Sequence, residues 1–270
     1  MSPGLSSAVA HPWRYRSLIS ILTHREVSGR YRGSLFGSVW SFITPLLMLA
    51  VYTLVFGLVL TTRAPGGGDG GMLMVALRLL AGTLTHALFA EVISRAPSLV
   101  VSQPNYVTKV VFPLEVLGWV SLFAALVHMG AALGLLLVVN GIWGTGFALS
   151  QLAIPVIMLP FAILLIGLVW LFAALGVYVR DLAQLVGPLV MVTMFLGPVF
   201  FPRSAMPAAL QPWLAINPVT VPIEQLRTVL FDHAWPDWTS LGNYALVAVV
   251  IYALGLTAFA SLKRGFADVL

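Results

Sequence analysis

Long stretches without charged side chains limit how this chain can fold more than any other feature. No charged residue lies between Leu35 and Arg63, and several later runs near 20 residues long are as apolar. A helix of about 20 apolar residues crosses the hydrocarbon core of a bilayer. The chain is 60% hydrophobic and 9% charged, whereas a soluble domain carries about 25% charge. The sequence therefore predicts an integral membrane protein of helices, because the strands of a barrel would give shorter, alternating segments.

The predicted fold class is all-α integral membrane, with six transmembrane helices in a single transmembrane domain over residues 1–270. The expected spans are residues 39–60, 72–93, 112–139, 149–177, 183–200 and 241–262. Span 183–200 is short and contains Gly187-Pro188 and Gly197-Pro198. Discontinuous spans of this kind often line a pathway, although a bent packing helix is the commoner explanation.

Two segments outside the spans carry expectations of their own. Residues 12–34 predict an amphipathic interface helix, with Tyr15, Leu18, Ile21 and Leu22 on one face; a plain juxtamembrane linker is the alternative. Residues 201–240 are too polar to span but contain several tryptophans, which favour the membrane interface. They predict short re-entrant helices in the outer leaflet before the last span, with a fully aqueous loop as the alternative.

Basic residues predict the orientation in the membrane. If both termini are cytoplasmic, ten Lys and Arg residues fall in cytoplasmic segments and three in outer segments, which is the positive-inside bias. The same bias explains the formal charge of +5 without a nucleic-acid partner. Arg78 lies inside the second span, where we expect it to snorkel to the outer interface. Contact with substrate, or a pair with Glu91 or Glu115, is the alternative.

Sequence motifs for common catalytic sites are missing. Neither lysine is followed by Ser or Thr, so the chain has no GK[ST] phosphate loop. The five histidines form no HExxH pattern, Gly-x-Ser-x-Gly is absent, and there is no cysteine. We therefore expect neither enzymatic activity nor a metal or cofactor in this chain, but a membrane pathway that something else drives.

The segment HREVSGRYRGSLFGSVWSFITPLLMLAVYTLVFG, residues 24–57, resembles the opening of permease subunits of polysaccharide-exporting (Wzm-type) ABC transporters of the ABC-2 superfamily. Those subunits carry R-E-x-x-x-R-Y-R-x-S-x-L-G-x-x-W-x-x-x-x-P before the first span. The matching residues here are Arg25, Glu26, Arg30, Tyr31, Arg32, Ser34, Gly37, Trp40 and Pro45, with Phe36 in place of leucine. Residues 99–117, 216–231 and 266–270 are similar as well, so the resemblance covers nearly the whole chain in order.

The resemblance implies a homodimer in the bacterial inner membrane that exports a lipid-linked polysaccharide, most simply O-antigen on polyprenyl diphosphate. It also implies two cytoplasmic ATPase subunits, which bind the ATP and Mg²⁺ that this chain has no motif for. Residues 201–240 would then be the periplasmic gate segment. Capsule or teichoic-acid export, export of drugs or small lipids, and a membrane-embedded glycan-modifying enzyme are the alternatives; for the last, the sequence offers no acid/base pair near an interface.

Three groups of site residues follow from this reasoning. Sugars stack on aromatic rings, so the candidates for lining the channel are Trp40, Phe42, Tyr52, Phe56 and Phe195, with lipid-facing or packing roles as the alternative. A diphosphate needs cations near the cytoplasmic interface; the candidates are Arg25, Arg30 and Arg32, which positive-inside anchoring explains equally well. The candidates implied for ATPase contact are Arg95, Asn105, Tyr106, Lys109, Arg180 and Asp181.

Overall fold

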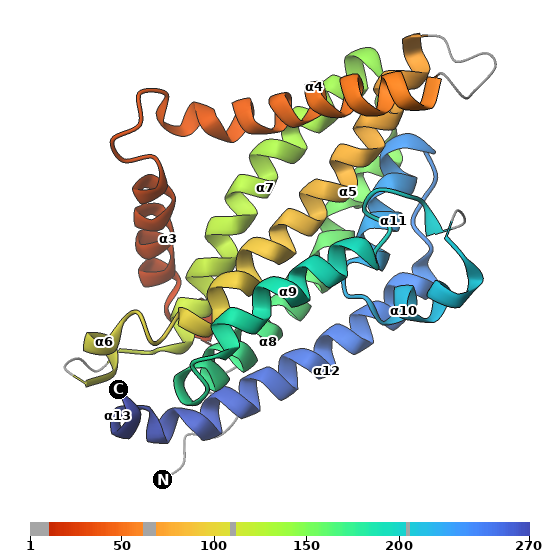
Figure 1. Cartoon of the computed structure of the whole chain (residues 1–270). Helices are drawn as coiled ribbons and strands as arrows, with labels where there is room; N and C mark the ends of the chain where they lie inside the picture. The colour runs from red at the N-terminus through yellow and green to blue at the C-terminus, as the bar shows by residue number, and fades with distance from the viewer. Residues whose placement is uncertain (1–10, 62–68, 109–111, 204–205) are drawn as a thin grey trace.

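The computed structural model describes residues 11–61, 69–108, 112–203 and 206–270, with the backbone alone at residues 11, 12, 56–61, 69 and 70. Every regular element in these ranges is helical (Figure 1). The α-helices are α2 (His11–Arg14), α3 (Arg16–Arg30), α4 (Trp40–Thr61), α5 (Asp69–Arg95), α6 (Pro104–Thr108), α7 (Glu115–Trp143), α8 (Ile154–Tyr178), α9 (Leu182–Phe195), α10 (Gln211–Ile216), α11 (Thr220–Phe231), α12 (Trp238–Leu262) and α13 (Phe266–Val269). Short 3₁₀ turns join them: η1 (Gly37–Val39), η2 (Ala96–Ser98), η3 (Leu149–Ala153), η5 (Ala208–Leu210) and η6 (Lys263–Gly265).

Five helical segments of the described chain are long and apolar enough to cross a membrane. They are Gly37–Val55, Gly71–Ser98, Glu115–Trp143, Leu149–Tyr178 and Trp238–Val269, which coincide with five of the six expected spans. The remaining expected span, 183–200, corresponds to the 14-residue helix α9. At 1.5 Å per residue, α9 is about 21 Å long, less than the ~30 Å hydrocarbon core. It ends at Phe195, short of residue 200, and Pro198 follows closely, which disfavours helical backbone just before it.

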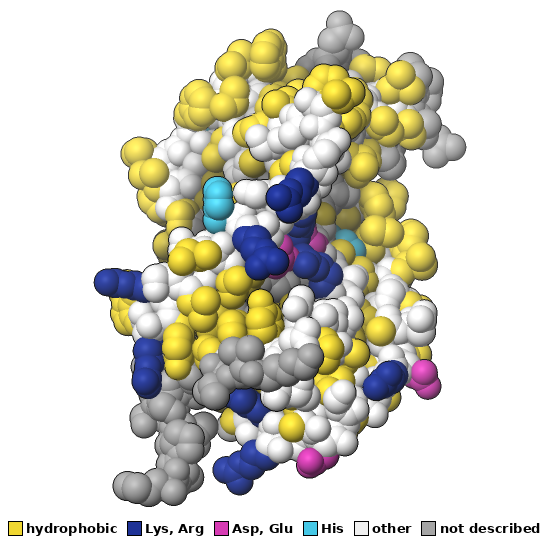
Figure 2. Space-filling model, turned by 90° about the vertical axis from the view of Figure 1, so that its left-hand side faces the viewer, with side chains coloured by type: hydrophobic (Ala, Val, Ile, Leu, Met, Phe, Trp, Pro, Cys, Tyr) yellow, Lys and Arg dark blue, Asp and Glu magenta, His cyan; other side chains and the backbone are white. Residues whose placement is uncertain are grey.

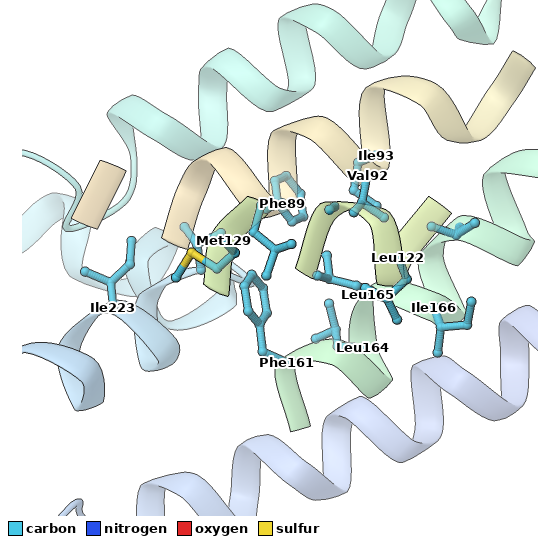
Figure 3. Close-up of a cluster of buried hydrophobic side chains, with 14 of the residues drawn as sticks. Phe89, Val92, Ile93, Leu122, Met129, Phe161, Leu164, Leu165, Ile166 and Ile223 are labelled. Atoms are coloured by element: carbon cyan, nitrogen blue, oxygen red, sulfur yellow. The ribbon is translucent and has the colours of Figure 1, made fainter. Parts of the chain in front are cut away.

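Helix α8 is the centre of the bundle and packs against α5, α7, α11 and α12. Figure 3 shows Phe161, Leu164 and Leu165 of α8 facing apolar side chains of α5 and α7. The closest approach is to α12, where a Cβ on Gly255 would collide with the backbone carbonyl of Gly167. Glycine pairs of this kind let membrane helices pack backbone to backbone.

Helix α4 lies at the periphery. Only 11% of its most apolar stretch is buried within the chain, whereas 56% of the corresponding stretch is buried in α5 and in α8. It crosses the outside of α5 and α7 in Figure 1 and exposes a run of large apolar side chains: Phe42, Leu46, Leu47, Met48, Val51, Leu54 and Val55. In a membrane, this face contacts lipid or another chain.

Helix α3 packs along the first half of α7. Ile19 is buried against Val116 and Val120, with Tyr15, Leu18 and Leu22 around it. The expectation that Ile21 shares this face is wrong, because Ile21 is 65% exposed. The side chain that completes the apolar face is Ile19, one turn after Tyr15. Placement of α3 in the membrane interface stays a prediction.

The segment 201–240 contains α10 and α11. Nine of the twelve residues of α11 are buried, because this helix packs between α5, α8, η3 and α12. A fully aqueous loop is therefore wrong for this part of the chain. The start of α12 is fixed by Asp237, whose side chain accepts hydrogen bonds from the backbone N–H groups of Thr239 and Ser240 at 3.0 and 3.3 Å, the geometry of an N-cap.

Candidate substrate-handling site

Two Glu-x-x-x-Arg motifs meet where α3 passes α5. Glu26 and Arg30 are one turn apart on α3, and Glu91 and Arg95 are one turn apart on α5. The pairing is crosswise: Arg30 forms an ion pair with Glu91, and Arg95 forms one with Glu26. Figure 2, which faces the α3 side of the molecule, shows basic side chains gathered around acidic ones at the centre of this face. The two helices are thus joined by alternating charges.

Tyr31, directly after α3, connects the elbow between α3 and α4 to the middle of α7. Its hydroxyl lies 2.5 Å from Ser41 Oγ and 2.9 Å from His128 Nδ1. The indole N–H of Trp40 donates to Ser34 Oγ at 3.0 Å. Through Tyr31, these bonds connect the first turn of α4 to α7.

A cavity of about 270 Å³ lies beside these contacts, close to the lower end of the range for small-molecule sites, about 300 Å³. Its polar lining is Arg30, Tyr31, Ser41, Thr44, Glu91 and His128, and Trp40 supplies an aromatic wall. We call it the elbow cavity. An aromatic ring beside several hydrogen-bonding groups suits a sugar, which offers apolar faces and hydroxyl edges.

The structure separates the three arginines proposed for the diphosphate. Arg30 is neutralised by Glu91 and also lies 3.9 Å from Glu26. Arg25 and Arg32 are exposed and form no ion pair within the part of the chain that the structure describes. Of the three candidates, Arg25 and Arg32 keep an uncompensated charge among the described residues.

The five aromatic candidates lie on two helices, α4 and α9, which both pack on α5. On α4, Trp40 and Phe42 are 39% and 46% exposed, whereas Tyr52 is half-buried and packs on the core. The side chain of Phe56 lies outside the described part. Phe195 is 61% exposed on α9, which packs mainly on α5 and α8, while α4 packs mainly on α5 and α7. Trp40 lines the elbow cavity, whose lining includes neither Phe42 nor Phe195.

The candidates for ATPase contact lie at the end of the bundle that carries α13 (Figure 1). Asn105 is exposed on α6, and Tyr106 stacks on Phe112 with ring centroids 4.4 Å apart. Arg180 and Asp181 form the exposed turn between α8 and α9. Arg95 is partly engaged by Glu26, and Lys109 lies outside the described residues.

At the opposite end of the bundle, a buried guanidinium fastens the chain that follows α9. Arg227 of α11 donates to the carbonyl oxygens of Pro198 (2.6 Å), Val199 (2.6 Å) and Arg78 (2.9 Å). Burial, and to a lesser degree the positive charge of nearby Arg78, lower the pKa of Arg227, and the carboxyl of Glu224 offsets part of this fall, so that the pKa is about 10. Arg227 is therefore still a cation at neutral pH.

Arg78 has a partner that the sequence did not suggest. Its guanidinium lies 2.5 Å from Asp232 Oδ1 and 5.2 Å from the ring centroid of Phe231. The alternatives Glu91 and Glu115 are wrong, since Glu91 pairs with Arg30 and Glu115 with Lys263 at 2.8 Å. Asp232 directly follows α11 in the chain, so this ion pair joins α11 to α5.

Several residues of the site were not among the site candidates proposed from the sequence: Glu26, Glu91, Ser41, His128 and Asp232. A signal did exist for some of them. The repeated Glu-x-x-x-Arg spacing gives neighbouring opposite charges on a helix, and His128 is an ionisable residue inside a span, which is a functional candidate by default. Nothing local indicates that the two motifs pair with each other.

Comparison with known proteins places this architecture in a family. Residues 17–231 match the ABC-2 type transporter family. A Myxococcus xanthus protein named O-antigen export system permease protein RfbA is 28% identical over 95% of this chain and 96% of its own length. Two Klebsiella pneumoniae proteins of the same name are 24% and 23% identical, each over 94% of this chain and 95% of its own length. Because the family match covers most of the 270 residues, this multi-pass membrane protein belongs to the ABC-2 type transporters.

Proposed function

We propose that this chain is the channel-forming permease subunit of an ABC exporter that moves a lipid-linked O-antigen across the bacterial inner membrane. The observation that carries the proposal is similarity over nearly the full length to proteins named O-antigen export permeases. The five long apolar helices support it, because they supply a membrane domain. We choose O-antigen over capsule or teichoic acid because the relatives are named O-antigen export permeases.

The energy comes from two ATPase subunits that bind ATP and Mg²⁺ on the cytoplasmic side. In this proposal they contact the end of the bundle that carries α13, through α6 and the turn at Arg180-Asp181. Both termini of the permease are then cytoplasmic. Supporting this choice, the basic residues Arg95, Arg180, Lys263 and Arg264 gather at that end, as the positive-inside rule requires.

A second copy of the chain completes the passage. The exposed apolar faces of α4 and α9 support a homodimer in which Trp40, Phe42 and Phe195 line a channel between the two copies. A polymer too large to be occluded at a midplane site needs such a continuous path. In this arrangement α9 is a sixth, shorter crossing, and residues 201–240 form the periplasmic gate.

The carrier lipid enters beside α3. Arg25 and Arg32 are exposed cations on this face, and phosphate oxygens bind guanidinium groups through charge-assisted hydrogen bonds. The elbow cavity, with Trp40 and Tyr31 in its wall, would take the sugar nearest the diphosphate. Arg30 would become available only when its ion pair with Glu91 opens.

Gene deletion tests the assignment. A deletion strain should lose surface O-antigen and accumulate the polymer on its carrier inside the cell, and the wild-type gene should restore export. Complementation with a variant carrying Arg25→Gln and Arg32→Gln should restore it poorly, whereas Arg264→Gln, which removes one cationic charge at the end of α12, serves as a surface control. Normal surface O-antigen in the deletion strain would contradict the proposal and would favour export of another polymer, a drug or a small lipid.

A further inference from the structure

A second cavity, of about 280 Å³, lies between α5, α11 and the chain after α9. Two guanidinium groups line it, those of Arg78 and Arg227. Its other walls are apolar: Val75, Leu79, Phe200, Phe201 and Pro202. A pocket with two cations on one side and hydrocarbon on the others is suited to an anionic head attached to an apolar chain.

Both arginines that line this cavity have unused hydrogen-bond donors. A guanidinium carries five N–H donors. Arg227 uses one donor from each of its three nitrogens for backbone carbonyls, which leaves two. Arg78 uses one for Asp232, which leaves four without an acceptor among the described residues. Asp232 pairs with Arg78, and Glu224 lies near both Arg227 and Arg203. Three arginines therefore face two carboxyl groups here, which leaves one surplus cation.

Four exposed tryptophans mark the height of the cavity. Trp143, Trp213, Trp235 and Trp238 are each more than half exposed and lie on elements at the end of the bundle opposite α13. Indole rings gather at the headgroup level of a membrane. Arg78, in the third turn of α5, is close enough to this level for its cationic head to meet lipid headgroups.

We propose that Arg78 and Arg227 form a binding site for the phosphate headgroup of a membrane lipid at this end of the bundle, with the lipid chain against Val75, Leu79 and Phe200. Arg227, held by three carbonyls, is a fixed charge. Arg78 is the adjustable contact, which exchanges Asp232 for phosphate. The choice of preferred ligand depends on the proposed function. That ligand is the polyprenyl diphosphate carrier in the leaflet to which it is delivered, and a bulk anionic phospholipid has the same headgroup chemistry.

Native mass spectrometry of the purified permease–ATPase complex, titrated with undecaprenyl diphosphate or with phosphatidylglycerol, tests the site. Arg78→Gln should weaken binding about tenfold, the effect of losing one charge-assisted hydrogen bond. Asp232→Asn should strengthen binding, because Arg78 no longer has an intramolecular anion. Arg203→Gln, an exposed arginine at the same end that does not line this cavity, is the charge-matched control and should change little.

The opposite signs expected for the two variants separate a ligand site from a structural ion pair, which both substitutions would weaken alike. Tighter binding of the diphosphate would identify the carrier as the ligand, and equal binding would identify bulk phospholipid; both results uphold a phosphate site. Binding of both lipids that is unaffected by Arg78→Gln, or weakened by Asp232→Asn, would overturn it. Since export is not the readout, failure here is distinguishable from failure of the proposed function.

Discussion

Polar side chains inside this bundle act on particular backbone groups. The last carbonyls of a helix have no partner within the helix, and in α11 side chains from other elements provide it. Asn140 Nδ2 donates to the carbonyl of Leu230 at 3.1 Å, and Ser150 Oγ donates to that of Val229 at 2.9 Å. These two residues satisfy carbonyls at the end of a short buried helix, which an apolar environment requires. Arg227 of the same helix does the reverse and donates to carbonyls of other segments.

Replacing Arg227 with Met should destabilise the protein, because the carbonyls of Pro198 and Val199 lose their donor while buried. One unpartnered buried acceptor costs about 1–3 kcal/mol, so we expect a loss of about 2 kcal/mol or more. The thermal unfolding midpoint in detergent reports it. Arg203→Met, on the surface of the same end, should leave the midpoint nearly unchanged, and equal midpoints for the two variants would contradict the structural role of Arg227.

Glu224 on α11 gives a pH dependence with a defined sign. Burial raises the pKa of its carboxyl, and the nearby Arg203 and Arg227 offset part of this rise. The folded state therefore binds the proton more tightly than the unfolded state, and stability falls as pH rises from the unfolded pKa through the folded pKa. Glu224→Gln removes this decline.

We expect wild type and Glu224→Gln to unfold at similar temperatures in acid, where the carboxyl is protonated in both states. Above the raised pKa, the variant should unfold at the higher temperature. Unfolding midpoints of both proteins across the acidic to neutral range measure the difference. A difference that does not change with pH would mean that Glu224 does not titrate in this way.

At the scale of elements, two contacts decide how the helices are arranged. The contact between α8 and α12 depends on the absence of side chains at Gly167 and Gly255. The contact between α3 and α5 depends on the crosswise ion pairs of two Glu-x-x-x-Arg motifs. The first is a rigid packing contact. The second consists of half-buried charges and is easier to open, because partly solvated ion pairs contribute little individually.

Gly255→Ala should separate α8 from α12, since the new Cβ collides with the backbone of Gly167. Overpacking of this kind costs about 1–3 kcal/mol, which the unfolding midpoint should record. Gly242→Ala provides a control within α12, as a Cβ there meets open space. A similar effect of both substitutions would assign the loss to α12 itself and not to its contact with α8.

A charge exchange tests the crosswise pairing. Glu26→Arg leaves three arginines around Glu91 and should reduce export of the polymer. Adding Arg95→Glu restores an ion pair of opposite charges between positions 26 and 95 and should recover much of the lost export. The measurement is surface O-antigen in a complemented deletion strain, with membrane levels of each variant as the control. If the double variant exports less than Glu26→Arg alone, these residues act independently.

For the whole molecule, the two ends of the bundle differ in character. The end with α13 carries basic residues and connects to α3, whereas the other end carries exposed tryptophans and the buried Arg227. The positive-inside rule supports the proposed orientation. In that orientation the residues near α13 are cytoplasmic, and the loop before α12 faces the periplasm.

Single cysteines can test this orientation without background, because the chain contains none. Ala234→Cys and Asp268→Cys place a thiol on exposed positions at opposite ends. A membrane-impermeant maleimide should label the first in cells whose outer membrane has been permeabilised, and the second only after the inner membrane is opened. Labelling of Asp268→Cys in intact spheroplasts would reverse the orientation.

The sequence by itself determined that this chain is a helical membrane protein and where five long spans lie. The free energy of transfer of a helix into lipid is a sum over consecutive residues. Hydropathy along the chain is therefore sufficient to locate the spans. The resemblance of residues 24–57 also identified the family, because it depends on the order of residue types alone. Short local patterns were less dependable: Ile19, not Ile21, faces α7, and α9 ends at Phe195.

Only the tertiary structure decided which polar groups meet. Arg78 and Asp232 are 154 residues apart in the chain, and Arg30 and Glu91 are 61 apart. Partners at such separations are chosen by the packing of whole helices, since each charge had several possible counterions and no local energy distinguishes among them. The same packing places Arg227 and Arg78 in one cavity and puts Trp40, but not Phe195, in the wall of the elbow cavity.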